Sequence, residues 1–166
     1  MAFGQSIVLS GDPGTRFEEG IISGTPKPGT CMTIKNAAKV GTRYTWEAFN
    51  AGGRDGGFQI IAVLREDDLS GVINSTAYVS GTRGFLYIPR AGDKLNMLVA
   101  DLTGTASASE LYEIGELFTP QDLTGKLLPS NLATNPVRKP FAALEATVLS
   151  SAYTADTLTA MMFTGF

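Results

Sequence analysis

The sequence predicts an all-β protein, built as a single small β-barrel or sandwich with an extended N-terminal arm. Three observations support this prediction. Glycine is abundant, at 19 of 166 residues, and it is spread along the chain in turn-like clusters. Short apolar stretches lie between these clusters, at spacings of roughly 8–12 residues, as in sandwiches and barrels. The hydrophobic content of 43% is that of a globular protein rather than of a disordered chain.

The first 20 residues differ from the rest and predict an arm rather than a core strand. They contain the turn-like "GDPG" at 11–14, few regular apolar positions and the charged "RFEEG" at 16–20. A terminal segment of this kind becomes ordered when something holds it, such as a partner surface. We therefore divide the chain into an arm at 1–20 and a β-rich domain at 21–166.

Two stretches in the first half of the domain predict strands. In "RYTWEAF", Tyr44, Trp46 and Ala48 alternate, which favours a strand with one face in the core. The same aromatic residues, with Phe49, also suit a stacking platform for a sugar or a base, although the core interpretation is favoured. The stretch 58–64, "FQIIAVL", is apolar at nearly every residue, as expected for a strand buried on both faces.

Further strands are predicted at 77–80, 85–88, 95–100 and near the end of the chain in "TLTAMMFTGF". Two segments, 107–118 and 140–149, carry helical as well as strand features, and we predict strands for both. Gly115 weakens a helix in the first, and Thr147 and Val148 favour a strand in the second. The three prolines between Pro129 and Pro140 predict an irregular loop.

Charge and composition argue against several classes of partner. The formal net charge is −3, which does not favour a phosphate-binding protein, so we expect no nucleic-acid partner. Residues 1–10 lack the pattern of a signal peptide, and no apolar run approaches the roughly 20 residues that cross a bilayer, so we expect no membrane partner and synthesis in the cytoplasm. Basic residues lean toward the first third of the chain, where Glu47 is the one acidic residue between positions 27 and 54, and we interpret them as scattered solvated charges: Lys27, Lys35, Lys39, Arg43 and Arg54.

The residues that most often carry out catalysis are scarce. The chain has no histidine, which removes the commonest general base near neutral pH and the imidazole metal ligand. It has no nucleophile-elbow, phosphate-loop, dinucleotide-binding or calcium-loop motif. Cys31 is the only cysteine, so there is no CxxC metal site, and a buried thiol is the expected state. We therefore expect no enzymatic activity, no cofactor and no metal.

The strongest remaining candidate site is the acidic run Glu66, Asp67 and Asp68 in "LREDDLSG". One interpretation is a hydrolase that uses Glu66 or Asp68 with Glu145, and another is a hard-cation site built on Glu66 and Asp68. Neighbouring residues of a strand point to opposite faces, and no spaced set of further ligands follows. We therefore favour a structural acidic turn, in which the Asp side chains accept hydrogen bonds from nearby backbone amides.

The order of the motifs along the chain is more informative than any one motif. The series runs "EGIISGTPKPGT" (19–30), "LREDDLSG" (64–71), "TAYVSGTRGFLYIPRAGDKLNMLVA" (76–100), "IGELF", "LTGKLLP" and "FAALEA" (141–146). This series resembles the small β-rich capsid decoration, or cement, proteins of tailed bacteriophages, over most of the chain from about Glu19. Thr82-Arg83, Glu116 and Cys31 depart from the family pattern.

The resemblance implies a non-enzymatic protein that binds the outer surface of an expanded phage capsid. Its partners would be the major capsid protein and two further copies of itself in a homotrimer, and its final location the virion surface. The family has no catalytic residues to carry over. The arm at 1–20 would extend the contact with the capsid, and the candidate contact residues are Phe3, Ile7, Val8, Leu9, Arg16 and Phe17. The alternative function is a virion-surface carbohydrate- or ligand-binding module that uses Tyr44, Trp46 or Tyr78.

Overall fold

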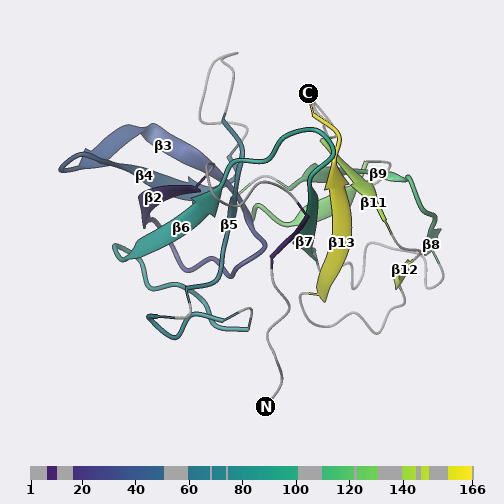
Figure 1. Ribbon diagram of the computed structural model, residues 1–166, viewed down its shortest axis with the longest axis horizontal. Coiled ribbons are helices and arrows are strands. Elements are labelled where there is room, and N and C mark those ends of the chain that lie inside the picture. Colours follow the sequence, from purple (N-terminus) through teal and green to yellow (C-terminus); the bar gives the residue numbers. More distant parts are fainter. Residues whose placement is uncertain are drawn as a thin grey trace.

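The strands form two small barrels that lie side by side (Figure 1). The computed structural model describes residues 7–10, 17–50, 60–67, 69–73, 75–100, 110–121, 123–130, 140–144, 147–149 and 157–165. Within these ranges the chain forms thirteen β-strands and no helix. The all-β class predicted from the sequence is therefore confirmed, with two barrels in place of one barrel or sandwich.

The first barrel, called the N-barrel, contains five strands in the closed order β2-β4-β3-β5-β6. The pairing of β2 with β4 is parallel and the other four pairings are antiparallel. Closure leaves these strands no free sheet edge. The strands are β2 (Phe17–Ile22), β3 (Cys31–Val40), β4 (Arg43–Ala48), β5 (Ala62–Leu64) and β6 (Arg83–Tyr87).

The second barrel, called the C-barrel, follows the order β7-β10-β9-β11-β13, and β13 pairs with β7 to close the ring. Its strands are β7 (Lys94–Val99), β9 (Leu117–Pro120), β10 (Leu127–Pro129), β11 (Phe141–Ala143) and β13 (Thr157–Phe163). β1 (Val8–Ser10) pairs with the first residues of β7. β8 (Glu110–Tyr112) and β12 (Thr147–Leu149) form a separate two-stranded sheet at the outer side of the C-barrel (Figure 1).

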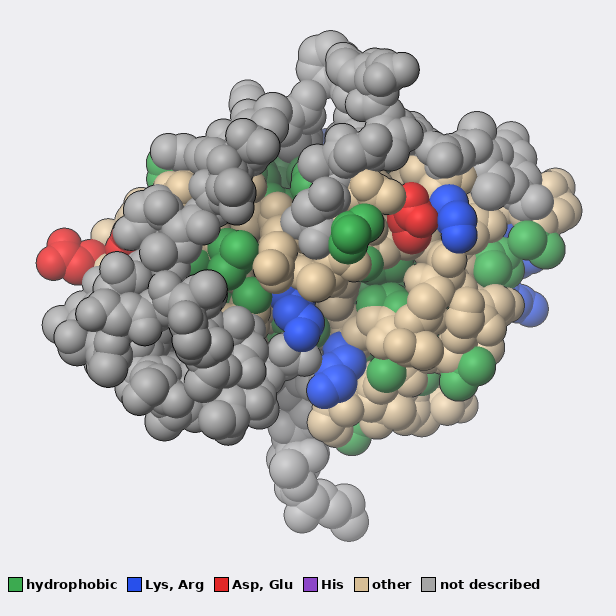
Figure 2. Space-filling view, turned by 180° about the vertical axis from the view of Figure 1, so that it is seen from behind, with side chains coloured by type: hydrophobic (Ala, Val, Ile, Leu, Met, Phe, Trp, Pro, Cys, Tyr) green, Lys and Arg blue, Asp and Glu red, His purple; other side chains and the backbone are tan. Residues whose placement is uncertain are grey.

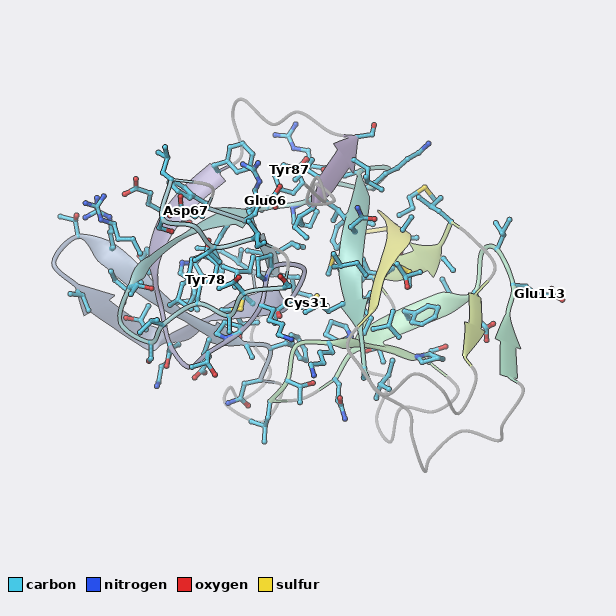
Figure 3. The ribbon with its side chains drawn as sticks, turned by 90° about the horizontal axis from the view of Figure 1, so that it is seen from below. Cys31, Glu66, Asp67, Tyr78, Tyr87 and Glu113 are labelled. Atoms are coloured by element: carbon cyan, nitrogen blue, oxygen red, sulfur yellow. The ribbon has the colours of Figure 1, made fainter. Side chains whose placement is uncertain are left out.

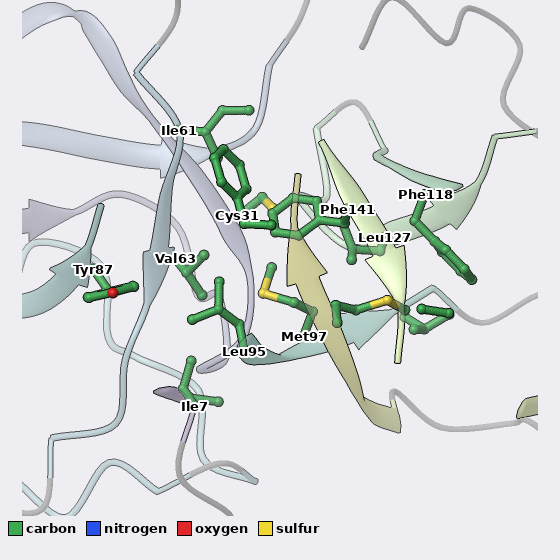
Figure 4. Packing of buried hydrophobic residues seen from close by; sticks show 14 residues of the cluster. Ile7, Cys31, Ile61, Val63, Tyr87, Leu95, Met97, Phe118, Leu127 and Phe141 are labelled. Atoms are coloured by element: carbon green, nitrogen blue, oxygen red, sulfur yellow. The ribbon is translucent and has the colours of Figure 1, made fainter. Parts of the chain in front are cut away.

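Alternating residues of the N-barrel strands supply two hydrophobic cores. Ala62 and Leu64 of β5 face the interior of the N-barrel with Trp46, whereas Val63 joins a cluster shared with the C-barrel. Successive side chains of a strand point to opposite faces, so a strand between two cores is apolar at every position. This arrangement confirms the prediction of burial on both faces for this part of 58–64. Figure 4 shows the shared cluster, in which Cys31, Ile61 and Val63 approach side chains from the C-barrel such as Met97, Leu127 and Phe141.

Two glycines allow the backbones of the barrels to approach closely. Gly29, with φ of +87°, accepts a hydrogen bond from the Leu98 N–H at 3.0 Å, and a Cβ there would lie 2.7 Å from Leu158 Cδ2. Gly125, with φ of +65°, accepts one from the Cys31 N–H at 2.8 Å, and a Cβ there would overlap the Cys31 carbonyl oxygen. Glycine is required at both positions by conformation and by space.

The N-terminal segment differs from the arm that the sequence predicts. Ile7 is fully buried in the shared core, and its carbonyl accepts a hydrogen bond from the Asn96 N–H at 2.7 Å. Phe17 begins a barrel strand, so the folded region starts before residue 21. The charged "RFEEG" concealed this strand because Glu19 lies on its half-buried face, bound by Arg43 from β4.

The predictions for the later strands have mixed outcomes. The strand predicted at 85–88 is β6 in slightly shifted form, the one at 95–100 is β7, and the one near the chain end is β13. Strands rather than helices occur in the described parts of 107–118 and 140–149, with a turn at Gly115. The prediction for 77–80 is wrong, because this segment forms no strand. Tyr78 is buried there as a single anchor, and its N–H donates to the Pro26 carbonyl.

Candidate functional site

The acidic run lies in a tight turn between β5 and β6. The Asp67 carboxylate accepts hydrogen bonds from the Leu69 N–H at 3.1 Å, the Ser70 N–H at 3.3 Å and the Ser70 hydroxyl at 2.7 Å. Asp67 and Val72 also exchange two backbone hydrogen bonds, of 2.8 and 2.9 Å, across the turn. These are the hydrogen bonds by which an aspartate stabilises a turn.

Glu66 binds the N-terminal segment rather than its neighbour in the acidic run. Its two carboxylate oxygens lie 3.3 and 3.4 Å from the Ile7 nitrogen, which donates to them. Figure 3 shows Glu66 near Tyr87, on the side of the N-barrel that faces β1, and Asp67 farther out. A carboxylate that accepts a backbone N–H holds that backbone in place, so Glu66 helps to fix the start of β1.

The carboxylates that the hydrolase and metal interpretations need lie partly outside the described residues. Asp68 and Glu145 lie outside the described residues. Among the residues that are described, no group of three or more histidine, cysteine, aspartate or glutamate side chains is placed to hold a metal ion. Glu113, a further acidic residue, is exposed at the opposite end of the molecule from Glu66 and Asp67 (Figure 3).

The aromatic residues of the ligand-binding alternative do not form an exposed platform. Trp46 is fully buried and Tyr78 is 1% exposed, so neither ring offers a face to a sugar or a base. Both belong to the N-barrel core, with Tyr44 packed against it from a half-buried position. Trp46 also lies against Gly20, where a Cβ would overlap the indole ring. The core interpretation that the sequence favoured is therefore confirmed for Trp46, and the stacking platform, its alternative, is not formed by Trp46 and Tyr78.

Burial raises the pKa of several groups in the N-barrel, among them Glu18, Tyr78 and Cys31. The Tyr78 hydroxyl donates to the Arg65 carbonyl at 2.7 Å. Burial, together with the nearby Asp67 and Glu66 carboxylates, raises the pKa of Tyr78 to about 12. Burial also raises the pKa of the Cys31 thiol, which is fully buried as the sequence predicts. A thiol in this state is a poor nucleophile near neutral pH.

A buried carboxylate stabilises the crossover from the N-barrel to the C-barrel. Asp93, in the "AGD" turn between β6 and β7, is 7% exposed. It accepts hydrogen bonds from the Tyr87 hydroxyl at 2.7 Å and the Arg90 N–H at 2.8 Å. Its own carbonyl accepts the Phe163 N–H of β13 at 2.9 Å. One residue of the turn therefore links β6, the crossover and the last strand of the C-barrel.

The candidate capsid-contact residues fall into three groups. Phe3 and Arg16 lie outside the described residues. Ile7 is buried, and Phe17 packs 5.6 Å from the Tyr87 ring, with the Arg65 guanidinium 4.3 Å above its own ring, so both belong to the fold rather than to a free arm. Leu9 is 48% exposed and remains accessible to a partner, while Val8 packs partly against the shared core.

An open cavity of about 400 Å³ lies where the two barrels meet, and we call it the junction groove. Its N-barrel wall is formed by the segment after β2 and by the end of β4, and its C-barrel wall by β7 and the turn between β9 and β10. The lining residues are 23–27, 30, 47, 48, 50, 98, 123, 124 and 126. Sites between structural units commonly bind ligands, and a volume of this size is in the usual range.

The described residues that line the junction groove include three charged side chains. Lys27 and Lys126 line it from opposite walls, and Glu47 is the one acidic residue in the described part of the lining. Lys35 lies beside Glu47, with 3.9 Å between ammonium and carboxylate, and donates to the Ser23 hydroxyl at 3.2 Å. Figure 2 shows cationic side chains near the middle of the rear face of the molecule.

Sequence reasoning missed this groove, because it treated the lysines as scattered solvated charges. The groove joins positions such as 27, 47 and 126, which lie far apart in the chain. The one local signal was a lysine within two residues of a turn glycine in both "KPG" and "TGK".

No protein-family model matches this chain, and no curated protein matches it either. Among the described residues, no helix has the length and apolar character needed to cross a membrane.

Proposed function

We propose that this chain is a non-enzymatic structural protein of a bacteriophage virion, which binds the outer surface of the expanded capsid as a trimer and stabilises it. The observation that carries the proposal is the ordered series of motifs between Glu19 and Ala146, which resembles capsid decoration proteins. Each motif alone is too short to identify a family, and the order of the motifs along the chain is what supports the proposal.

The places that these motifs occupy in the fold support the proposal. "KPG" and "TGK" provide Gly29 and Gly125, at which the two barrels touch. "AGD" provides Asp93 in the crossover, and "EDDL" provides Asp67, which closes the turn after β5. The motif residues therefore act in architecture, as expected when a resemblance reflects a shared fold rather than a shared reaction.

Binding to a lattice stabilises it by mass action, because a ligand of one state shifts the equilibrium toward that state. A protein that binds only the expanded capsid therefore opposes its disruption by packaged DNA. In a trimer the three contacts act together, since the second and third become intramolecular once the first has formed. Modest contacts on each subunit are sufficient for stable attachment.

Co-sedimentation tests the proposal directly. Expanded, undecorated heads are assembled from the major capsid protein of the same phage and mixed with increasing amounts of the purified protein. We expect saturable pelleting at a fixed ratio to capsid subunits, and none with unexpanded procapsids. Failure to pellet with expanded heads at both low and moderate salt would refute the proposed function. Sedimentation velocity of the unbound protein then determines whether trimers exist before binding.

A further inference from the structure

We infer that the slot that holds residues 7–10 is a strand-acceptor site, and that in the trimer proposed above it is filled by the N-terminal segment of a neighbouring copy of the chain. The slot consists of the start of β7, the Glu66 carboxylate and the apolar pocket around the Ile7 side chain. This inference deepens the trimer of the proposed function and rests on that part of it.

One edge of β7 recognises the backbone of the segment. The Asn96 N–H donates to the Ile7 carbonyl at 2.7 Å, and the next N–H groups on the same edge, at Leu98 and Ala100, donate to the N-barrel and to β10. The other edge of β7 pairs with β13 along its whole length. The segment therefore fills the start of an edge that is otherwise fully used. Because Asn96 is buried, an empty slot would leave its N–H without an acceptor, so the slot needs an occupant.

An apolar pocket and a carboxylate complete the slot. The Ile7 side chain is fully buried in the shared cluster, beside Leu95 (Figure 4). The Ile7 N–H donates to the two Glu66 oxygens, which lie 3.3 and 3.4 Å away. Such a site binds an extended peptide by strand addition, in which backbone hydrogen bonds supply affinity and a side-chain pocket supplies specificity. The sequence that fits it is that of residues 7–10, which every copy of the chain carries.

The contacts of the segment are equally available to a second copy. Glu66 lies 59 positions after Ile7 and β7 lies farther still, whereas β2, the next strand along the chain, belongs to the other barrel. The segment of a neighbouring copy would make the same contacts, so exchange costs little. A segment favours its own slot only through its high effective concentration there, and this advantage disappears where a neighbour's segment lies equally close. When each copy passes its segment to the next, the trimer closes with every slot filled.

The connection from β1 to β2 limits how far a segment can reach. It consists of residues 11–16, with the sequence "GDPGTR". A fully extended connection of this length spans about 25 Å, so the slot of the neighbouring copy must lie within that distance of the start of β2. Proline restricts the residue before it to extended backbone, so the pair Asp12-Pro13 favours the long reach that exchange requires.

A disulfide across the pairing of β1 with β7 tests which chain fills the slot. Ser10 and Lys94 are Cα partners in this antiparallel pairing, and both are exposed. Facing residues of antiparallel strands have Cα atoms about 4.5–5.5 Å apart, within the range that a disulfide bridges. Full-length Ser10→Cys and full-length Lys94→Cys, distinguished in size by a tag, are refolded together at high concentration and oxidised in air, both free and after addition of expanded heads. We expect a disulfide-linked heterodimer on non-reducing gels. Cys31 does not compete, because it is fully buried.

A matched control measures disulfides that form by random collision. Ile114→Cys takes the place of Lys94→Cys, because Ile114 is 70% exposed and its neighbour Glu113 lies well away from β1 (Figures 1 and 3). Collisions would link Ser10→Cys to either cysteine, whereas only the partner in the slot is held within bonding distance. We expect at least roughly tenfold less heterodimer with the control.

A second control asks whether the linkage depends on the anchor of the segment. Ile7→Ala is added to the Ser10→Cys chain, so that its weakened segment must compete with the intact segment of the other chain. We expect roughly three- to tenfold less heterodimer, because the buried isoleucine is what fills the pocket. Unchanged Trp46 fluorescence verifies the fold of each variant.

The outcomes separate this inference from the proposed function. If the heterodimer is no more abundant than with Ile114→Cys, both free and on heads, each segment fills its own slot and the exchange is refuted. A yield that Ile7→Ala does not lower refutes it as well, because the linkage then forms outside the slot. Pelleting of the wild type with expanded heads decides the capsid-binding proposal independently. If the wild type does not pellet, the free protein alone decides the exchange.

Discussion

Tyr78 shows how a single buried side chain can organise a long connection without a strand. Its backbone N–H binds Pro26, its hydroxyl binds Arg65, and its ring fills the N-barrel core. The segment around it is otherwise exposed, with Val79 at 67%. The aromatic residue therefore anchors residues 75–82 from the inside, which explains why an apolar pattern at 77–80 resembled a strand.

The raised pKa of Tyr78 predicts a loss of stability at alkaline pH. A tyrosine with a pKa near 10 when unfolded and about 12 when folded binds its proton more tightly in the folded state. Below pH 10 both states are protonated, and this contribution is complete. Between pH 10 and 12 the unfolded state loses its proton first, so the free energy of unfolding falls by up to about 1.4 kcal/mol per pH unit.

Tyr78→Phe isolates this contribution, because all other titrating groups remain. We expect the variant to be less stable near neutral pH by about 1 kcal/mol, since the Arg65 carbonyl loses its hydrogen-bond donor. Its stability should also decline less steeply above pH 10 than that of the wild type. Urea unfolding at a series of pH values measures both effects. Parallel stability curves for the two proteins above pH 10 would show that Tyr78 does not titrate in this way.

At the scale of elements, the turn between β9 and β10 joins the barrels through Gly125. Gly125→Ala places a methyl group against the Cys31 carbonyl oxygen and 2.7 Å from Thr30 Cγ2, and the obstacle is partly backbone. We expect a loss of about 3 kcal/mol or more, since the strain of the left-handed conformation adds to the overlap. Differential scanning calorimetry measures it.

Gly41→Ala is the matched control for Gly125→Ala. Gly41 has a φ of +63°, close to that of Gly125, but nothing lies within 4 Å of the added Cβ. Its substitution should cost only the conformational strain, about 1–2 kcal/mol. If the two variants were equally destabilised, close packing at the barrel junction would contribute nothing beyond backbone conformation.

Substitutions at Ile7, just before β1, and at Leu9, within β1, distinguish the role of the N-terminal segment in folding from a role in binding. Ile7→Ala removes a fully buried side chain from the shared core, and we expect a loss of about 2–4 kcal/mol in the free energy of unfolding. Leu9→Ala, at a position 48% exposed, should change stability by less than about 0.5 kcal/mol. Chemical denaturation of both variants tests this contrast.

The burial of Ile7 also determines the expected effect of removing the arm. Deletion of residues 2–15 removes Ile7 and β1, so it lowers stability as well as any capsid affinity. Weaker head binding by Leu9→Ala at unchanged stability would identify a direct contact. Equal losses of stability in Ile7→Ala and Leu9→Ala would contradict the structural assignment of Ile7 to the core.

The strands that were predicted and the strand that was missed show which structural information a local sequence pattern carries. The apolar pattern predicted the burial of residues 61–64 because both faces of β5 meet apolar cores, so no partner had to be known, whereas Ile60 before it is 50% exposed. β2 was hidden because its acidic residue Glu19 is paired with Arg43 and Arg83, which lie 24 and 64 positions away. A carboxylate on a barrel strand looks like a solvent-exposed charge until its distant partners are placed. The junction groove was hidden for the same reason.

At the scale of the whole molecule, the two barrels share one core and cannot be treated as independent units. The shared cluster contains residues of β3, β5 and β6 from the N-barrel and of all five C-barrel strands. Asp93 and the glycine contacts add hydrogen bonds across the same boundary. Each barrel therefore leaves apolar surface exposed when the other unfolds, and such a penalty couples their unfolding.

Trp46 provides a direct test of this coupling, because it is the one tryptophan in the chain and is fully buried in the N-barrel core. Phe118→Leu weakens the C-barrel instead, on the side of the shared cluster away from the N-barrel strands (Figure 4). We expect a loss of about 1 kcal/mol. If the barrels unfold together, the urea midpoint reported by Trp46 fluorescence shifts as far as the midpoint reported by circular dichroism. A Trp46 midpoint that stays at the wild-type value would mean that the N-barrel unfolds on its own. The junction groove is lined by both barrels, so it would then be disrupted as soon as the less stable barrel unfolds. Cooperative unfolding would instead leave the groove intact up to the global transition.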